Sequence, residues 1–347
     1  MSTFQKWSDS ALPSVRDALQ LLASSGPVDT GALHSSAHIT GPLPIDVLAV
    51  TGRDRVRFLN AMLSNDVVLL DGAGPDHGVR ATLSSVQGRL VADTHLYLVD
   101  QEKKTGSMLA LFEADASHAF VEMLDKYVIA EKVYFEPAEL VAIAICGPGA
   151  EETLRAAGAD LPHESHHAHI ATKVGGIPTR IIRRDLGVPE GHLLLVTEGE
   201  VDALSASLNL PSATLEQLEA ARIEGPLPRA GGDMTPLNIV LEAGLKDRAV
   251  SFTKGCYIGQ EVICRIDSMG TPARLLVQLQ GGEEPPSPGT ELFRDGKAVG
   301  YVTSAVDSVR LGGPVFLGYV KKRSNEPGTA LQVGEADGPS AEIQAVV

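Results

Sequence analysis

Residues 254–261 read KGCYIGQE and place a lysine, a thiol, an aromatic ring and two glycines within eight positions. The apolar residues that follow Tyr257 fall on one helical face, so the stretch predicts a turn into a helix with Cys256 near its N-terminus. That position and the neighbouring Lys254 ammonium both favour a thiolate over a thiol. A free cysteine is also often a small buried hydrophobic residue. The local sequence leaves both interpretations open.

The composition is that of a globular protein with several short elements. A chain of 347 residues exceeds one typical core, and domains of about 100–200 residues predict two or three units. Aromatic residues make up only 4% of the chain, so leucine, valine, isoleucine and alanine must fill the cores. The 35 glycines and 21 prolines favour many turns over a bundle of long helices.

Charge and cysteine content indicate a cytoplasmic protein. A net charge of −15 argues against a surface that binds nucleic acid directly. Residues 1–25 lack the apolar run of a signal peptide, and no stretch reaches the roughly 20 apolar residues of a membrane span. Cys146, Cys256 and Cys264 have no metal-ligand spacing. Reduced thiols are therefore expected, with Cys146 and Cys264 as packing residues.

Periodicity divides the chain into three regions. Residues 45–50 (IDVLAV) predict a strand, Asp54 can cap the following helix, and residues 80–100 predict a hairpin whose turn is VQGR. A second α+β region begins near residue 131. From about residue 272, strand-like runs alternate with Gly/Pro turns, as in a small antiparallel barrel or sandwich.

Isolated polar residues in apolar surroundings are candidate site residues. Asp93 lies in an apolar strand and needs either solvent at a sheet edge or a donor partner. Glu224 precedes a Gly-Pro turn. A simple ion pair with Arg222 would explain this acid as well as a role in a site would. The histidine-rich stretch HESHHAH (163–169) suggests a metal site, but no compact cysteine or carboxylate set completes it. A polar loop and no metal are expected there.

Several motifs together resemble one family. KGCYIGQE is similar to the K-G-C-Y-x-G-Q-E signature of YgfZ-type folate-binding proteins, which are relatives of the glycine-cleavage T-protein (GcvT) aminomethyltransferases. Further similar stretches span roughly residues 40–335; they are VTGRDRVRFLNAMLSNDV (50–67), VQGRLVADTHLY (86–97), ICGPGAEETL (145–154), RIEGPLPRAGGDMTP (222–236) and VGYVTSAV (299–306).

The resemblance implies an α+β fold, in which three domains form a ring around a central folate channel. The expected domains are an N-terminal α+β folate-binding unit at 1–135, completed by 212–268, a ferredoxin-like insert at 136–211, and a small C-terminal β-barrel at 269–347. The implied cofactor is tetrahydrofolate or a derivative.

The resemblance also implies site residues. Asp93 and Glu224 would line the folate pocket, with Tyr97, Arg222 and Tyr257 nearby. A carboxylate such as Glu224 can accept two hydrogen bonds from the amino-pyrimidine edge of a pterin.

The reactive residues implied by the resemblance are Cys256, Lys254 and Asp93. Lys254 would lower the pKa of the Cys256 thiol and could also receive the acidic tail of folate. Asp93 would act on an amine if the protein is a transferase.

Three departures separate the chain from the classical transferases. It has Ala92-Asp93 where those enzymes show two acids, it has Glu113 where they tend to carry asparagine, and it has the KGCY cysteine, which they lack. The resemblance therefore implies a folate-binding accessory protein that acts on iron–sulfur client proteins in assembly or repair. A folate-dependent aminomethyltransferase or demethylase and a non-catalytic scaffold stay open as alternatives, so enzyme activity is left undecided.

Overall fold

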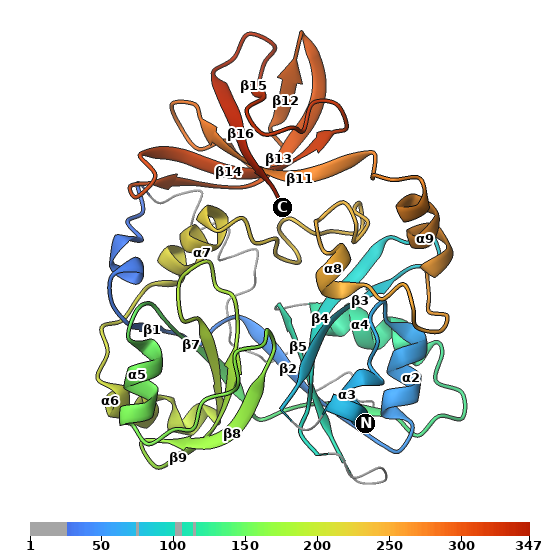
Figure 1. The fold of residues 1–347 in the computed structure, drawn as a ribbon, viewed down its shortest axis with the longest axis vertical. Helices are drawn as coiled ribbons and strands as arrows, with labels where there is room; N and C mark the ends of the chain where they lie inside the picture. Colours follow the sequence, from blue (N-terminus) through green and yellow to red (C-terminus); the bar gives the residue numbers. More distant parts are fainter. Residues whose placement is uncertain (1–25, 74–75, 101–105, 114–115) are drawn as a thin grey trace.

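The computed structural model describes residues 26–347, apart from 74–75, 101–105 and 114–115. Two antiparallel sheets lie side by side, and a closed barrel lies across one end of both (Figure 1). The predicted α+β fold with a C-terminal β-barrel is thus confirmed. The expectation that residues 1–25 carry no leader falls outside the described residues.

The first sheet is built from the N-terminal region. Its order is β3 (Gly78–Ser84), β4 (Leu90–Leu98), β5 (Met108–Glu113), β2 (Ile45–Thr51) and β6 (Tyr134–Pro137). The predicted hairpin is confirmed, since β3 and β4 pair from Gly78↔Tyr97 to Ser84↔Leu90. Helix α2 (Arg55–Met62) begins directly after Asp54, as predicted, but the Asp54 side chain does not cap it and accepts from Lys132 N instead. A short helix, α3 (Leu69–Ala73), follows it.

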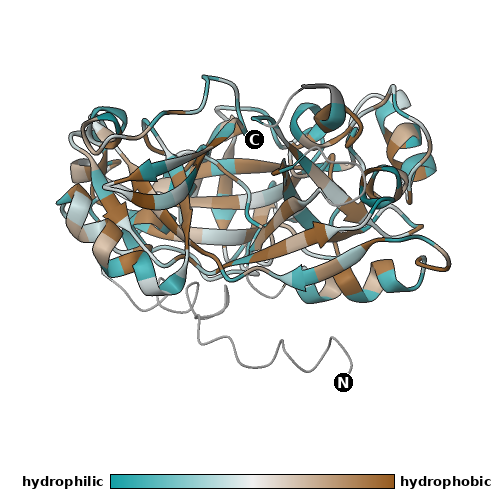
Figure 2. Ribbon diagram, turned by 90° about the horizontal axis from the view of Figure 1, so that it is seen from below, coloured by the Kyte–Doolittle hydropathy of each residue, from teal (hydrophilic) through white to brown (hydrophobic). Residues whose placement is uncertain are grey.

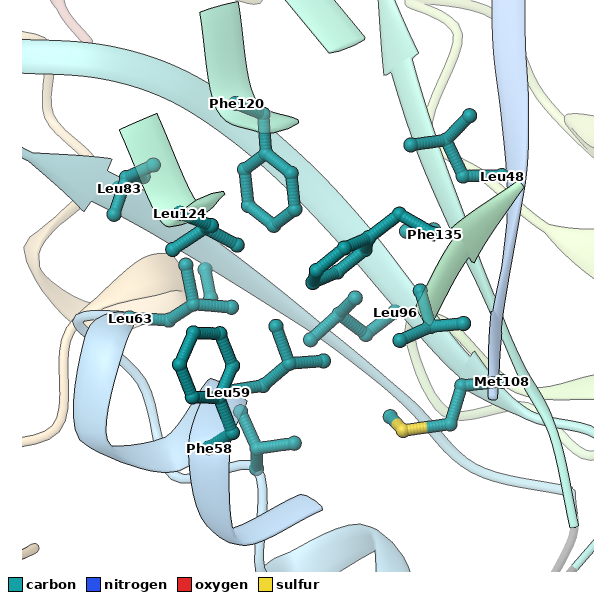
Figure 3. Packing of buried hydrophobic residues seen from close by; sticks show 14 of the residues in the cluster. Leu48, Phe58, Leu59, Leu63, Leu83, Leu96, Met108, Phe120, Leu124 and Phe135 are labelled. Atoms are coloured by element: carbon teal, nitrogen blue, oxygen red, sulfur yellow. The ribbon is translucent and has the colours of Figure 1, made fainter. Parts of the chain in front are cut away.

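One face of the first sheet holds its hydrophobic core. Helix α2 and helix α4 (Ala116–Asp125) pack Phe58, Leu59 and Phe120 onto this face (Figure 3). The Phe120 ring lies 4.8 Å from Phe112 of β5 and 6.0 Å from Phe135 of β6, measured between centroids. Because this face is filled, the opposite face of β4 and β5 is the one that can line a site.

The second sheet combines one strand that precedes the first sheet in the chain with four strands that follow it. Its order is β1 (His38–Thr40), β7 (Val141–Cys146), β10 (His192–Val196), β9 (Ile177–Arg183) and β8 (His169–Val174). Helices α5 (Ala150–Ala156) and α6 (Val201–Leu208) cover it, the latter after a short 3-10 turn, η3 (Glu198–Glu200). Cys146 is buried, in line with its expected packing role. β1 precedes the first sheet in the chain, yet it pairs with β7. The domain boundaries stay a prediction.

Short helices connect the sheets to the barrel. They are η2 (Gly31–His34), α7 (Leu215–Glu224), α8 (Lys246–Ala249) and α9 (Gln260–Ser268). A capping box fixes the start of α7, because the Thr214 hydroxyl accepts from Gln217 N and the Gln217 side chain accepts from Thr214 N. In Figure 2 the outer helices alternate between hydrophobic and hydrophilic residues, as helices packed by one face do.

Six strands close the C-terminal barrel. Their order is β11 (Arg274–Gly281), β14 (Gly313–Lys321), β13 (Lys297–Ser308), β12 (Glu291–Arg294), β15 (Ala330–Val333) and β16 (Ser340–Val346), and β16 pairs back onto β11. Inward-facing leucine, valine and phenylalanine side chains fill the interior. The barrel is therefore a packed body that adjoins α7, and it encloses no large channel of its own.

Candidate functional site

A cavity of about 400 Å³ lies where the two sheets meet α7. Its apolar wall comes from leucines of several elements, including Leu43, Leu193, Leu215 and Leu218. Its polar wall is made of charged and imidazole side chains, which are Arg80, His95, Glu113, His166, His167, Arg184, Asp185, Glu219, Arg222, Arg229, Asp247 and Arg248. An apolar cleft with a convergent set of polar groups is the usual form of a small-molecule site.

Asp93 is a buried partner of an arginine behind this cavity. Its side chain comes from β4, which lies between β3 and β5, so the residue is 5% exposed and the solvent-facing alternative is wrong. Arg80 donates from Nε to Oδ1 over 3.0 Å and from Nη2 to Oδ2 over 2.7 Å. Asp93 also lines a side cavity of about 10 Å³ together with His95 and Glu113. Both carboxylate oxygens are therefore engaged in a bidentate pair.

Glu113 places a second carboxylate at the end of β5. It lines both the main and the side cavity. Burial raises the pKa of Glu113, and the charges of Arg229 and Arg184 oppose that rise. No hydrogen-bond donor among the described residues pairs with its side chain. The sequence marked Glu113 only as a departure from the classical transferases, which tend to carry asparagine there.

The opposite wall of the cavity is a buried network of charges on and after α7. Glu219 accepts from Arg222 Nη2 over 2.6 Å and from Arg229 Nη1 over 2.8 Å. Arg222 also donates from Nη1 to Asp233 Oδ2 over 2.6 Å. Burial alone would lower the pKa of Arg222, but the charges of Asp233 and Glu219 raise it. The alternative ion pair of Arg222 with Glu224 is therefore wrong.

Glu224 does not line the cavity, contrary to the prediction. Its carboxylate accepts from Thr30 Oγ1 over 2.7 Å, Ser308 Oγ over 2.5 Å and Arg310 Nε over 2.7 Å. A step of five residues turns a helix by about 140°, so Glu224 points away from the face that carries Glu219. It joins α7 to the barrel, and sequence reasoning missed Glu219 as the acid that faces the cavity.

Tyr97 is buried beneath the site and does not line it. Its ring meets the His169 ring edge-on, with 5.2 Å between centroids. Burial raises the pKa of the Tyr97 hydroxyl. Tyr97 can therefore affect a ligand in the cavity only indirectly, by positioning the residues that line it.

The histidine-rich stretch folds against the first sheet. The His167 ring lies 4.9 Å from the His95 ring, and both residues line the cavity. Burial lowers the pKa of His167 to about 3. The described residues contain no group of three or more side chains that could hold a metal ion. The polar-loop prediction fits the exposed His163 and His166, whereas it is wrong for the fully buried His169.

His169 should make the protein acid-sensitive. Its Nε2–H donates to His77 O over 3.2 Å and its Nδ1 accepts from Arg180 Nη1 over 2.7 Å, so the ring is held neutral. Burial lowers its pKa from 6.5 to about 3. Below pH 6.5 the unfolded chain binds a proton that the folded chain cannot, so stability falls as pH falls toward 3. At pH 5 we expect this residue to account for a loss of about 2 kcal/mol relative to pH 7.

Urea unfolding of wild type and His169→Gln at pH 7, 6 and 5 measures this contribution. The variant should lose less stability between pH 7 and pH 5, whatever its stability at pH 7. His166→Gln changes an exposed ring and should keep the wild-type slope. Equal slopes in wild type and His169→Gln would contradict the assignment.

The KGCY stretch is a loop clamped to the first sheet. Lys254 Nζ donates to three carbonyl oxygens at and just after the end of α2, those of Asn60 (2.5 Å), Leu63 (2.8 Å) and Asn65 (2.7 Å). Burial lowers the pKa of Lys254 to about 8. All three donors of its ammonium are therefore used on the backbone, where they anchor the loop.

The rest of the motif differs from the prediction in where the helix starts. Helix α9 begins at Gln260, four residues after Cys256, and Gly259 precedes it with φ +81°. A Cβ on Gly259 would lie 2.6 Å from Ser85 O, so only glycine fits against the β3–β4 turn. Cys256 is exposed, which contradicts the buried alternative, and Tyr257 is buried.

The structure thus separates the predicted site residues into two groups. Asp93 and Arg222 belong to the cavity region, whereas Lys254, Cys256 and Tyr257 are not among its lining residues. The KGCY loop forms its own surface feature beside α2 and the β3–β4 turn.

Comparison with known proteins points to one family. The family model of the glycine cleavage T-protein C-terminal barrel domain matches residues 274–346, which contain all six barrel strands. The tRNA-modifying protein YgfZ of Vibrio vulnificus is 27% identical over 282 residues, 79% of this chain and 78% of that protein. The human mitochondrial iron-sulfur cluster assembly factor IBA57 is 27% identical over 322 residues, 88% of this chain and 84% of that protein.

Other relatives extend the comparison. A chloroplastic transferase candidate of Arabidopsis thaliana is 27% identical over 297 residues, and the chain spans 66% of that relative's length. Several further relatives are aminomethyltransferases. In the described residues no helix is long and apolar enough to cross a membrane.

A solved structure supports the same assignment at the level of the fold. The glycine cleavage system aminomethyltransferase T of Bartonella henselae superposes with a TM-score of 0.79 at 21% identity, over 96% of this chain and 90% of that one. Sequence relatives, barrel and overall fold agree. They support a relation of this chain to the YgfZ/GcvT-like proteins.

Proposed function

We propose that this protein binds a tetrahydrofolate in the central cavity and serves as a cytoplasmic accessory protein in the assembly or repair of iron–sulfur enzymes. The observation that carries the proposal is the convergence of apolar, carboxylate and arginine side chains from both sheets and α7 on one 400 Å³ cavity. The relation to an iron-sulfur cluster assembly factor supports the choice of client proteins.

The cavity chemistry suits a ligand with a flat donor-rich ring. The amino-pyrimidine edge of a pterin offers two parallel N–H donors, which a carboxylate can accept. We assign this contact to Glu113, because its carboxylate faces the cavity without a donor among the described residues. Asp93 accepts two hydrogen bonds from Arg80 and so holds that cavity-lining side chain in place. Glu224, the acid chosen from the sequence, already accepts three hydrogen bonds elsewhere.

Titration with tetrahydrofolate under anaerobic conditions tests the site. Glu113→Gln removes the negative charge at nearly unchanged volume, and we expect it to weaken binding about 10- to 100-fold. Glu284→Gln changes an exposed acid in the barrel and should bind like wild type. Equal affinity of Glu113→Gln and wild type would refute the assignment of Glu113. Absence of binding to wild type would favour the scaffold alternative.

Cys256 is assigned the thiol chemistry of the accessory role. It is exposed on a loop that Lys254 anchors, so a partner protein can reach it without entering the cavity. The proposal predicts that a deletion strain loses iron–sulfur enzyme activity and that Cys256→Ala does not restore it, although this variant should fold because the side chain is exposed. Full restoration would remove the thiol from the proposal.

A folate-dependent aminomethyltransferase is the second candidate. The aminomethyltransferase relatives and the position of Asp93 beside the cavity favour it. It requires Asp93 to act on an amine, although both of its oxygens already accept from Arg80. Formation of methylene-tetrahydrofolate, ammonia and free carrier from tetrahydrofolate and an aminomethylated carrier by the purified protein, and loss of this reaction in Asp93→Asn, would decide for this candidate.

A further inference from the structure

Arg229 carries two hydrogen-bond donors that the protein leaves unused. The residue lies in the loop after α7, is 8% exposed and lines the cavity. Its Nη1 donates to Glu219 Oε2 over 2.8 Å. Its Nε and Nη2 are enclosed and have no partner among the described residues. An enclosed donor without an acceptor is costly, so a native site of this kind needs a partner to explain it.

The two unused donors lie on the same edge of the guanidinium. In a planar guanidinium, Nε–H and the Nη2–H beside it point in parallel, in the fork that pairs with both oxygens of a carboxylate. Glu219 occupies the other end of the group and fixes its orientation. Arg229 is therefore held by one carboxylate while it presents a two-donor edge to a second.

The surroundings of this edge favour an anion. Arg184 and Arg248 also line the cavity, and neither forms an ion pair with an acid of the described residues. The nearby acid Glu219 is already shared by Arg222 and Arg229. A carboxylate that reaches Arg229 would meet positive charge at a residue that is 8% exposed, and such attraction is stronger at a buried group than in open water.

We propose that Arg229 is a specificity-determining residue that binds a carboxylate group of the cavity ligand. The proposal rests on the proposed function for the identity of that ligand: the carboxylate is then one of the glutamyl tail of folate. The same fork could be filled by a separate small carboxylate bound beside the pterin. Both sources share one chemistry, a planar carboxylate that accepts two parallel hydrogen bonds.

Paired ligands of similar shape, one with carboxylates and one with amides that offer a single acceptor oxygen each, test the fork. We would measure the affinities of tetrahydrofolate and of its bis-amide, in which both glutamyl carboxylates are amides, for wild type, Arg229→Lys and Arg229→Gln. Wild type should prefer tetrahydrofolate about 10- to 100-fold, Arg229→Lys should retain part of this preference, and Arg229→Gln should lose it. Both ligands are compared within each variant, so a general loss of stability cancels. Arg53→Gln, at an exposed arginine, should keep the wild-type ratio.

A second pair of probes separates this proposal from the proposed function. 4-Aminobenzoylglutamate and its bis-amide lack the pterin, and acetate is the simplest carboxylate. If wild type does not distinguish tetrahydrofolate from its bis-amide but acetate raises its thermal midpoint and not that of Arg229→Gln, the fork binds a separate carboxylate. If no folate binds, the proposed function fails, while Arg229-dependent binding of 4-aminobenzoylglutamate still supports the fork. If no carboxylate probe depends on Arg229, the proposal is overturned.

Discussion

Asp233→Ala should lower the free energy of unfolding by about 3–5 kcal/mol, the usual result of leaving a buried partner charge unpaired. Asp233 is fully buried, and its Oδ2 accepts from Arg222 Nη1 over 2.6 Å and from Arg229 N over 3.0 Å. Its Oδ1 accepts from Thr303 Oγ1 over 2.5 Å and from Ser304 Oγ over 2.6 Å. One carboxylate thus joins the cavity wall to the barrel. Urea unfolding followed by circular dichroism measures the loss.

Two further variants sharpen this test. Asp233→Asn keeps one acceptor oxygen and the volume, so its destabilisation should be smaller than that of alanine. Glu284→Ala removes an exposed acid of the barrel and should change stability by less than about 0.5 kcal/mol. If Asp233→Ala behaves like Glu284→Ala, the buried network does not hold α7 to the barrel.

Lys254→Met should lower the free energy of unfolding by about 2–4 kcal/mol, because three carbonyl oxygens lose a charged donor. Methionine retains the apolar stem, so the loss reports the hydrogen bonds more than the packing. Cys256→Ala should stay within about 0.5 kcal/mol of wild type, since that side chain is exposed. Differential scanning calorimetry of both variants gives the comparison.

The pair also distinguishes two roles for the lysine. If Lys254 only anchors the loop, the thiol of Cys256 in correctly folded Lys254→Met should react with iodoacetamide with the same pH dependence as in wild type. A shift of that profile to higher pH would assign Lys254 the thiol-activating role predicted from the sequence. Equal stability of Lys254→Met and wild type would exclude the anchor.

The sequence predicted those helices and strands whose formation depends on residues close together in the chain. The β3–β4 hairpin and the barrel strands have alternating apolar residues bounded by turn residues, so their pairing follows from the sequence. The helix after Asp54 was equally clear. The prediction for α9 began too early, because the apolar Ile258 extends the helical pattern into a turn that Gly259 ends with a positive φ.

The candidate site was predicted only in part because its residues meet through tertiary structure. Asp93 and Glu113 lie on adjacent strands, and Asp93 was found through its unusual apolar surroundings. On α7 both Glu219 and Glu224 are buried, so no local signal tells which of them faces the cavity. The carbonyl partners of Lys254 lie 189 to 194 residues away in sequence. Spacing within the KGCY motif cannot reveal contacts of that range.

The first described residues have a consequence for how the chain assembles. Val28 N donates to Asp307 O over 2.8 Å, Val309 N donates to Val28 O over 3.0 Å, and β1 pairs with β7 more than a hundred residues later. During synthesis this segment leaves the ribosome early, whereas its barrel partners are made near the end of translation. Contacts of such long sequence separation slow folding. Docking of this segment onto the barrel is therefore expected to be a late step, and newly made chains would depend on protection from aggregation until it occurs.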